Sequence, residues 1–368
     1  MAPPSPRGNA HSWLYAGVPP GGSSGGSLRA AHLPRELIAR TGGAVIAAYG
    51  RRGIPVLAAA TALRSRLWSG GLNVYSARLL PSPALRLLSR GVRGWVLDLH
   101  DHPRLQSEAL GVPLSARLRA ELDDLVQRNV EAFGRLAVPS ASFAELCALP
   151  AERVVVASNG TDTDHIRPGP WGTEPTVGMV SGAVPGRGIE LLVDAVQRLR
   201  SEYPGVVLRL ALAATGPASR RYLDELAASL EPTGWVRVQR LPYEQLPAFL
   251  ARCQVMVIPH PPGAYMDVAT PVKLFDGMAA GRPTVVTPRH ETAAIVRRND
   301  AGIVTAGDGA DDLAQAIGSL LRSDAERRRL GANARRAAES GYDWRVISGA
   351  LADAVLGPRA SEAQNASR

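Results

Sequence analysis

The sequence is poor in lysine, in cysteine and in long apolar runs. Lys273 is the one lysine among 42 basic residues, so the other 41 are all arginines. Cys147 and Cys253 are too few and too far apart for a disulfide framework, and they are typical of thiols in a reducing compartment such as the cytoplasm. Arginine or glycine interrupts each apolar run well before the ~20 residues that a membrane span needs, so no spanning helix is predicted.

The two ends of the chain look unstructured. The start, MAPPSPRGNAHSW, contains no apolar segment of signal-peptide length. We therefore expect a disordered arm at residues 1–10 and a disordered tail at residues 357–368. The length of 368 residues exceeds one typical core and favours two domains of about 150–200 residues each.

The net charge is +9, and some of the arginines occur in short groups, at 220–221, 297–298, 327–329 and 335–336. No aromatic residues alternate with these groups and no nucleic-acid-binding motif accompanies them, so no nucleic-acid partner is predicted. Solvated helix faces are the favoured interpretation. Attraction to anionic substrates, or peripheral contact with an anionic membrane surface, is the alternative.

The chain alternates between apolar strand-like runs and amphipathic helix-like segments, which predicts parallel sheets covered by helices. In the first half the pattern predicts a helix over 27–40 and a strand over 95–101, WVLDLHD, whose carboxyl end is rich in polar side chains. The fold class we expect is α/β, with two doubly wound, Rossmann-like domains facing each other across a ligand-binding cleft.

The Pro- and Gly-rich segment NGTDTDHIRPGPWGTEP, at 159–175, interrupts this alternation and is the best candidate for a domain boundary. We expect an N-terminal domain at 11–165, a linker at 166–175 and a C-terminal domain at 176–342. A helix at 343–356 should then cross back to the N-terminal domain.

The lone lysine lies in TPVKLFDGMAAGRP, residues 270–283, directly after the buried-strand pattern QVMVIPH. Thr270 is a suitable N-cap, and Pro271 suits the first helical position because its missing N–H is not needed there. Gly281 suits a left-handed C-cap. This pattern predicts a helix over 270–280 with Lys273 in its first turn.

The start of such a helix suits a phosphate, because free backbone N–H groups and the positive end of the helix dipole point there. Lys273 adds a compact positive charge. Asp276, three residues further on, could accept the hydroxyls of a ribose. A plain helix turn with a local Lys–Asp pair explains the same residues equally well, so both interpretations stay open on the residues alone.

The segment resembles the P-x-K-x-x-E-x-x-A-x-G-x-P signature of retaining GT-B glycosyltransferases of the broad family 4, or group 1. Further stretches resemble that family in the same order: VLDLHDHP, the passage that ends in SNGTDTDHIRP, VGMVSGAVPGRGIELLVDAVQRLR, LPYEQLPAFLARCQVMVIP and SGYDWRVISGAL. The similarity extends over nearly the whole chain and is strongest over 150–345.

The resemblance implies a role for each matching residue. Asp276 would hold the ribose, and Lys273 and Arg187 would face the diphosphate as catalytic groups. His100 would contact the transferred sugar, although a structural histidine is the alternative, and His102 is a weaker candidate. The remaining donor-site residues are implied by their place in the motifs: Thr270, Pro271, Val272, Gly188 and Gly182. The glycine-rich loop at Gly22, Gly25 and Gly26 would lie beside the acceptor and the diphosphate.

The same resemblance implies a cytoplasmic, metal-independent, retaining enzyme. It would move a sugar from a nucleoside diphosphate sugar to a hydroxyl of a small-molecule or cell-envelope glycan acceptor, without a cofactor. Asp162 and Asp164 imitate a metal-binding pair, but they coincide with the family's hinge turn, so no metal site is expected. The first of the family's two glutamates would fall at Val268 and is missing, which leaves a catalytically lapsed nucleotide-sugar-binding protein as the alternative.

Overall fold

The computed structural model describes residues 12–17, 24–41, 45–49, 72–88, 92–214 and 216–357. They form two compact units. Unit 1 contains the described residues up to Arg104, together with Leu114–Ser158 and the chain from Trp344 onward. Unit 2 contains Leu105–Pro113 and Asn159–Asp343. The predicted arm at 1–10, Gly22 of the predicted loop, and all but the first residue of the predicted tail lie outside the described residues.

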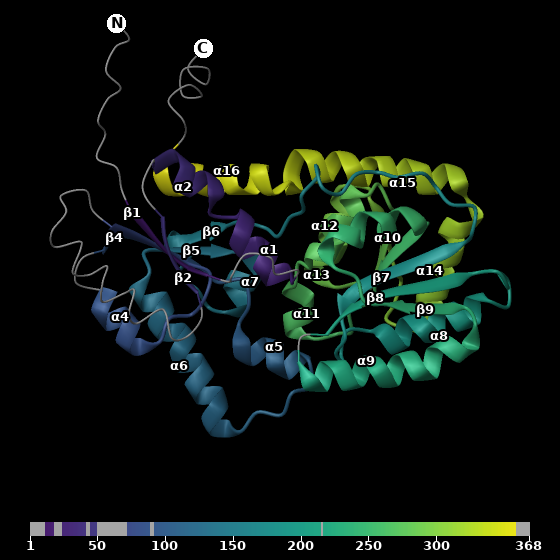
Figure 1. Ribbon diagram of the computed structural model, residues 1–368, viewed down its shortest axis with the longest axis horizontal. Coiled ribbons are helices and arrows are strands. Elements are labelled where there is room, and N and C mark those ends of the chain that lie inside the picture. Colours follow the sequence, from purple (N-terminus) through teal and green to yellow (C-terminus); the bar gives the residue numbers. More distant parts are fainter. Residues whose placement is uncertain are drawn as a thin grey trace, which may run out of the picture. The chain divides into compact units, whose positions relative to one another are not determined.

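Unit 1 is built on a parallel sheet of six strands in the order β2-β1-β3-β4-β5-β6 (Figure 1). The strands are β1 (Ser12–Gly17), β2 (Val45–Tyr49), β3 (Leu72–Ser76), β4 (Val92–Asp98), β5 (Arg135–Val138) and β6 (Val154–Val156). The helices of this part of the chain are α1 (Gly25–His32), α2 (Arg35–Thr41), α4 (Ser82–Leu88), α5 (Pro103–Ala109), α6 (Ala116–Ala132), α7 (Ala141–Leu146) and the C-terminal α16 (Trp344–Leu356).

The helix predicted over 27–40 is divided in two. The N–H of Leu33 still donates to the carbonyl of Arg29, but the next residue is Pro34, which has no N–H to continue the pattern. A new helix, α2, then starts at Arg35. Proline therefore sets the break that the apolar pattern alone did not reveal.

Unit 2 is built on a second parallel sheet of six strands in the order β12-β11-β10-β7-β8-β9. The strands are β7 (Thr176–Gly182), β8 (Val207–Ala213), β9 (Val236–Gln239), β10 (Val255–Ile258), β11 (Thr284–Val286) and β12 (Gly302–Val304). The helices are α8 (Ile189–Leu199), α9 (Pro217–Leu230), α10 (Leu246–Arg252), α11 (Ala264–Val268), α12 (Val272–Ala279), α13 (His290–Arg298), α14 (Ala310–Arg322) and α15 (Asp324–Ala337), which a π-helical turn (Ala338–Tyr342) extends.

The strands of unit 2 are apolar on both faces because helices cover both faces of the sheet (Figure 1). In β10, Val255 and Val257 pack into the core formed with α8 and α14. The alternate residues, Met256 and Ile258, pack into the core formed with α10 and α12. The predicted doubly wound α/β architecture is confirmed.

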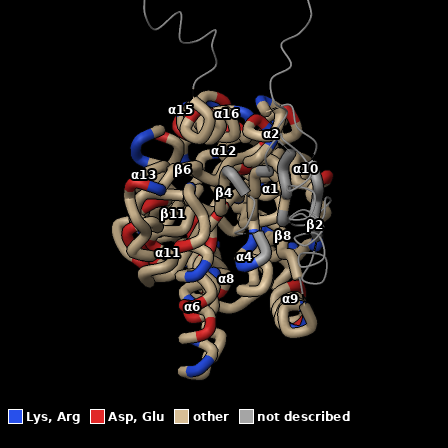
Figure 2. Tube along the Cα trace, turned by 90° about the vertical axis from the view of Figure 1, so that its left-hand side faces the viewer, with Lys and Arg blue, Asp and Glu red and all other residues tan. Residues whose placement is uncertain are grey.

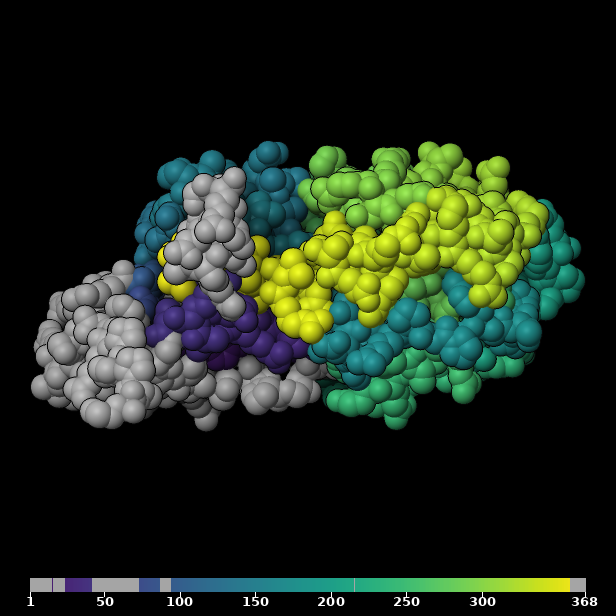
Figure 3. Space-filling model, turned by 90° about the horizontal axis from the view of Figure 1, so that it is seen from above, coloured from purple at the N-terminus to yellow at the C-terminus, as the bar shows by residue number. Residues whose placement is uncertain are grey.

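The Pro- and Gly-rich boundary segment packs on unit 2 from Asn159 onward, whereas the sequence placed the division at residue 166. Arg282, which is fully buried, donates to the carbonyls of Gly169 and Pro170 and lies 4.1 Å from the ring centre of Trp171. Arg335 of α15 donates to the carbonyl of Ile166, and Figure 3 shows this stretch beside α15. A segment with the composition of a linker is thus fixed by arginines that satisfy its backbone.

The predicted return of the C-terminal helix to the first part of the chain appears as α16, which belongs to unit 1. Ser348 accepts a hydrogen bond from the N–H of Glu36 and donates one to the carbonyl of Leu33. Trp344 stacks on His32, with ring centres 5.7 Å apart. Within the described residues, no helix is both long and apolar enough to cross a membrane.

The arginine groups lie mainly on helix surfaces among acidic residues. Figure 2 shows basic and acidic positions interspersed along α6 and α15. In α15, Arg328 pairs with Asp324, and Arg329 pairs with Glu326. This arrangement is the solvated-face interpretation that the sequence favoured, and exposed pairs of this kind contribute little stability.

Candidate functional site

The predicted donor-site residues gather at one edge of unit 2, where the strand order reverses between β7 and β10. In open parallel sheets, the loops at such a switch point diverge and leave room for a ligand. Arg187 follows β7, His260 follows β10 and Arg289 follows β11, all at the carboxyl ends of these strands. Lys273 lies in the first turn of α12, between β10 and β11.

The loop after β7 depends on two glycines with left-handed backbone conformations, Gly186 (φ +77°) and Gly188 (φ +76°). A Cβ at Gly188 would lie 1.8 Å from the carbonyl oxygen of Pro259, so a side chain there would force the two loops apart. Gly188 is also the N-cap of α8, and Arg187 precedes it directly. The glycine therefore holds Arg187 and the start of α8 against the loop that follows β10.

Gly182 ends β7, and nothing lies within 4 Å of a Cβ built on it. Glycine is not required there by packing, so its assignment to the donor site stays a prediction.

His260 was missed by the sequence analysis. The residue is only 5% exposed, and its Nδ1 has no hydrogen-bond partner. Burial, followed by the charges of Arg187, Lys273 and Arg289, lowers the pKa of His260 to about 3. The imidazole is therefore neutral, and the three cationic groups near it make this edge of the sheet electropositive, which suits an anionic ligand.

Acidic residues compensate the charge of Arg289. Its guanidinium donates to both oxygens of Asp308, at 2.6 and 2.7 Å, and to Asp267 at 3.2 Å. Asp267 directly precedes Val268, the position at which the sequence analysis found the first glutamate missing. The charge of Arg289 is thus balanced by residues of the protein itself.

The sequence could have indicated His260 and Arg289. Each closely follows an apolar strand run, in VMVIPH and in TVVTPR, and polar residues at the carboxyl ends of parallel strands share one edge of the sheet. His100 was selected for its place after a strand, whereas His260 and Arg289 were not.

The helix that carries Lys273 starts later than predicted. Its first residue is Val272, and Pro271 occupies the N-cap position without a side-chain hydrogen bond. Thr270 is therefore not the N-cap, and Pro271 is not the first helical residue. The carbonyl of Thr270 instead accepts a hydrogen bond of 2.7 Å from the side-chain amide of Asn159. Lys273 is half-buried, and its position in the first turn of α12 agrees with the prediction.

Asp276 lies deeper than the sequence suggested, with only 3% of its surface exposed. The hydroxyl of Thr161 donates to its Oδ1 at 2.9 Å. Burial nevertheless raises the pKa of Asp276 to about 7, against the opposing effects of the Thr161 hydrogen bond and the charge of Lys273. One hydroxyl and a neighbouring cation do not replace the water that this carboxylate has lost, so further hydroxyl donors would stabilise its charged form.

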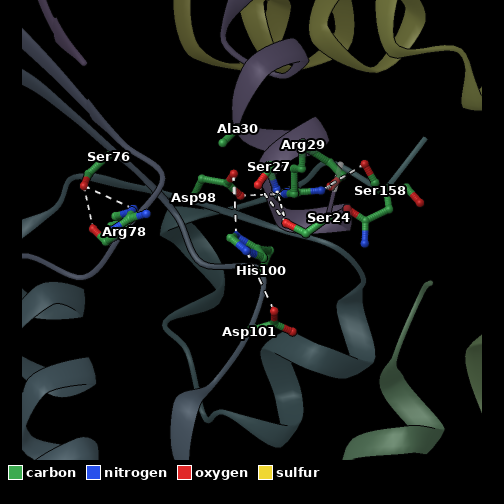
Figure 4. A network of polar contacts seen from close by, with 12 residues as sticks. Ser24, Ser27, Arg29, Ala30, Ser76, Arg78, Asp98, His100, Asp101 and Ser158 are labelled. Carbon is green, nitrogen blue, oxygen red and sulfur yellow. Dashed lines mark hydrogen bonds and ion pairs between the residues drawn. The ribbon is translucent and has the colours of Figure 1, made fainter. Parts of the chain in front are cut away.

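His100 belongs to a separate polar cluster in unit 1, shown in Figure 4. The strand predicted over 95–101 ends at Asp98, so His100 lies two residues beyond its carboxyl end. Arg29 of α1 donates from Nε to Oδ1 of Asp98 at 2.7 Å, and the side chains of both residues are fully buried. A Cβ at Gly26 would lie 3.0 Å from Nε2 of His100, so this glycine leaves room for the ring.

The first turns of α1 contain the described part of the predicted glycine loop. Gly25 is the first residue of the helix, and Ser24 caps it by accepting a hydrogen bond from the N–H of Ser27. Gly25 and Gly26 are therefore helical rather than part of an open loop.

The weaker candidates have local partners. Nε2 of His102 lies 3.6 Å from Asp123 of α6 in a largely buried position. Asp162 accepts hydrogen bonds from the N–H groups of Asp164 and His165, which is the chemistry of a turn. No cluster of three or more His, Cys, Asp or Glu side chains suited to a metal ion occurs within the residues that the structure describes.

A family model described as "Glycosyl transferases group 1" matches residues 174–323. The GDP-mannose-dependent alpha-(1-6)-phosphatidylinositol monomannoside mannosyltransferase of Mycolicibacterium smegmatis is 29% identical over 54% of this chain and 55% of its own length. The MMP alpha-(1->4)-mannosyltransferase of Mycolicibacterium hassiacum is 32% identical over 58% of this chain and 51% of its own length. The chain thus spans about half the length of these curated relatives.

The fold comparison covers more of the chain. The crystal structure of Anabaena Alr3699/HepE in complex with UDP and glucose matches with a TM-score of 0.67 and 16% identity, over 94% of this chain and 98% of that one. Together with the two Rossmann-like sheets, the comparisons show that the chain has the GT-B fold and that residues 174–323 match the family model for group 1 glycosyltransferases.

Proposed function

We propose that the protein is a glycosyltransferase that moves a sugar from a nucleoside diphosphate sugar to an acceptor hydroxyl. The observation that carries this proposal is the set of cationic groups around a neutral, buried His260 at the switch point of unit 2. Cations gathered at the carboxyl edge of a parallel sheet attract an anionic ligand, and a diphosphate has this chemistry. The relatives named as mannosyltransferases and the UDP complex of a structural neighbour support the same class of donor.

The proposed donor site has three parts. The N-terminal ends of α8 and α12 offer unsatisfied backbone N–H groups to the diphosphate, beside Arg187 and Lys273. Asp276 accepts the ribose hydroxyls, which provide the donors that its buried carboxylate lacks. Thr270, Pro271 and Val272 form the backbone at the start of α12.

The proposed chemistry is transfer with retention and without a metal ion. The leaving diphosphate helps to deprotonate the acceptor hydroxyl on the same face of the sugar. Its growing negative charge is stabilised by the fixed cations and helix ends, which need no reorganisation at the moment of reaction. His100 contacts the transferred sugar, and the acceptor is a small molecule or a cell-envelope glycan.

A binding screen followed by a turnover assay tests this function. UDP, GDP and dTDP are compared by thermal shift, and the matching sugar donors, with GDP-mannose first, are then assayed for hydrolysis and for transfer to soluble and lipid-linked acceptors. We expect one diphosphate to bind and its donor to turn over. Binding without turnover of any donor would favour the catalytically lapsed alternative, and no binding by any diphosphate would contradict the proposed site.

Lys273→Ala is expected to lower kcat by at least about tenfold, which corresponds to about 1.4 kcal/mol. Charge on the departing diphosphate grows as the glycosidic bond breaks, so a cation there contributes more in the transition state than in the ground state. Lys273→Arg should restore only part of the rate, because a planar guanidinium does not replace a compact ammonium. Steady-state kinetics of a folded Lys273→Ala protein with unchanged kcat would show that the lysine only pairs locally with Asp276.

Exhaustive treatment with EDTA is expected to leave the transfer rate within about twofold of the untreated rate. The reason is that Arg187, Lys273 and the helix ends already supply the positive charge that a metal ion provides in other phosphate sites. The measurement is the initial rate before and after chelation and after addition of Mg²⁺ or Mn²⁺. A loss that either ion reverses would contradict metal independence.

A further inference from the structure

A fully buried ion pair between Arg29 and Asp98 lies next to His100 in unit 1. Besides its bond to Asp98, Arg29 donates from Nη1 to the carbonyls of Ala157, at 2.7 Å, and of Ser158, at 3.0 Å (Figure 4). The arginine therefore ties the end of β4 to the segment that follows β6. Because a buried guanidinium needs a counter-charge, this arrangement also fixes the position of the Asp98 carboxylate.

The second carboxylate oxygen of Asp98 faces the histidine. Its Oδ2 lies 3.8 Å from Nδ1 of His100, and both atoms are buried without a hydrogen-bond partner. The buried hydroxyl of Tyr75 is a second donor near this carboxylate, and burial, followed by the charge of Asp98 and a hydrogen bond to it, raises the pKa of this tyrosine. Buried polar atoms rarely stay without partners, so a small rotation of the ring or a bridging water between Asp98 and His100 is expected.

The two nitrogens of His100 have different surroundings. Nδ1 is buried on the side of Asp98, whereas the side chain as a whole keeps 20% of its surface exposed. Nε2 lies over Gly26 and is 3.8 Å from the carboxylate of Asp101. Gly26 leaves space at Nε2, and Figure 4 shows the ring between Asp98 and Asp101.

We propose that Asp98 is a positioning residue for His100. Its carboxylate, fixed by Arg29, holds the proton of the neutral imidazole on Nδ1 and thereby leaves Nε2 as an acceptor for a hydroxyl of the bound sugar. A carboxylate that fixes the tautomer and the orientation of a histidine is a recurring device in enzyme sites. The identity of the hydroxyl rests on the proposed function. The expected tautomer of His100 does not.

The tautomer of His100 can be measured by long-range ¹H–¹⁵N NMR of the whole protein at pH 8, with the signals assigned by comparison with His100→Gln among the seven histidines. We expect the Nδ1–H form to predominate in the wild type. Asp98→Asn should shift the population toward Nε2–H, because the charge that favours a proton on Nδ1 is removed. Asp101→Asn is the matched control, since its carboxylate lies at the same distance from the other nitrogen, and it should leave Nδ1–H predominant.

The outcomes separate this inference from the proposed function. A wild-type protein with the proton of His100 mainly on Nε2 would overturn the inference, even if Asp98→Asn fails to fold. Where the variant folds, kcat should fall at least about tenfold while KM for the donor stays within about twofold, and unchanged kcat would also overturn the positioning role. If no donor is turned over by the wild type, the proposed function fails while the tautomer measurement still decides the role of Asp98.

Discussion

Asp276→Asn is expected to weaken the binding of the nucleoside diphosphate by about 1–3 kcal/mol and, at the same time, to stabilise the folded protein at pH 8. The first effect follows from the loss of charge-assisted hydrogen bonds to the ribose, which are stronger than neutral ones. The second follows from burial, because the carboxylate of Asp276 is 3% exposed and its pKa is raised to about 7.

The direction of the stability change depends on pH. Below about pH 4 the side chain of Asp276 is protonated in both the folded and the unfolded protein, so its ionisation has no effect on stability. Between about pH 4 and 7 the unfolded chain loses the proton while the folded protein keeps it, and the free energy of unfolding decreases as pH rises. Above about pH 7 the carboxyl group is ionised in both states, so the free energy of unfolding decreases no further through this group. Asparagine removes this dependence, so the variant should match the wild type near pH 4 and be about 1–3 kcal/mol more stable at pH 8.

Urea denaturation at pH 4 and pH 8, and calorimetry with the diphosphate that binds the wild type, measure the two effects. The difference in affinity between wild type and variant should also shrink below about pH 7, because the wild-type carboxyl group is then protonated. Asp164→Asn is a suitable control, since Asp164 lies on the same segment as Thr161 but is exposed. Unchanged affinity in a stabilised Asp276→Asn protein would remove the ribose from the role of this residue.

The sequence predicted the fold well because the alternation of apolar strands and amphipathic helices is a local signal. The position of Lys273 in the first turn of its helix was also predictable, since Pro271 and the preceding strand run are adjacent in sequence. The N-cap was assigned wrongly, because Thr270 has the right side chain but its carbonyl is bound by Asn159, 111 residues earlier. Local patterns identify the helix but not the distant partner that changes its first residues.

The environment of the site residues could not be predicted, because distant segments create it. Asp276 accepts a hydrogen bond from Thr161, 115 residues away in the chain, and burial in the folded protein raises the pKa of its carboxyl group even though this hydrogen bond opposes the shift. His100 was selected for its place at a strand end, but the buried Arg29–Asp98 pair behind it joins residues 69 apart. The residue types were visible in the sequence, whereas burial and charge became visible only in the folded protein.

The requirement for glycine at position 188 also comes from a distant segment that the local sequence does not reveal. The sequence indicated a turn after a strand, where glycine is one of several suitable residues. The structure shows that a Cβ at this position would lie 1.8 Å from the carbonyl oxygen of Pro259, in a loop 71 residues further along the chain. The requirement for glycine therefore comes from the close approach of two loops at the switch point, and the proposed diphosphate site depends on that approach.

Gly188→Ala is accordingly expected to destabilise the protein by about 2–5 kcal/mol and to weaken diphosphate binding at least about tenfold. A left-handed backbone costs a residue with a Cβ about 1–2 kcal/mol, and displacing the Pro259 loop adds about 1–3 kcal/mol. Moving that loop also shifts His260 relative to Arg187, so the anion site should be lost together with the packing. Urea denaturation and calorimetry with the diphosphate measure both effects.

Two other glycines of unit 2 separate these contributions. Gly234→Ala places alanine at nearly the same backbone angle, φ +78°, but with nothing within 4 Å of its Cβ, so it should show the cost of the backbone alone, about 1–2 kcal/mol. Gly182→Ala has neither a positive φ nor a neighbour within 4 Å and should change stability by less than about 0.5 kcal/mol. If Gly188→Ala lowers the free energy of unfolding no more than Gly234→Ala does, the loop that contains Pro259 moves aside without strain. If the variant also binds the diphosphate like the wild type, the contact between the two loops does not shape the site.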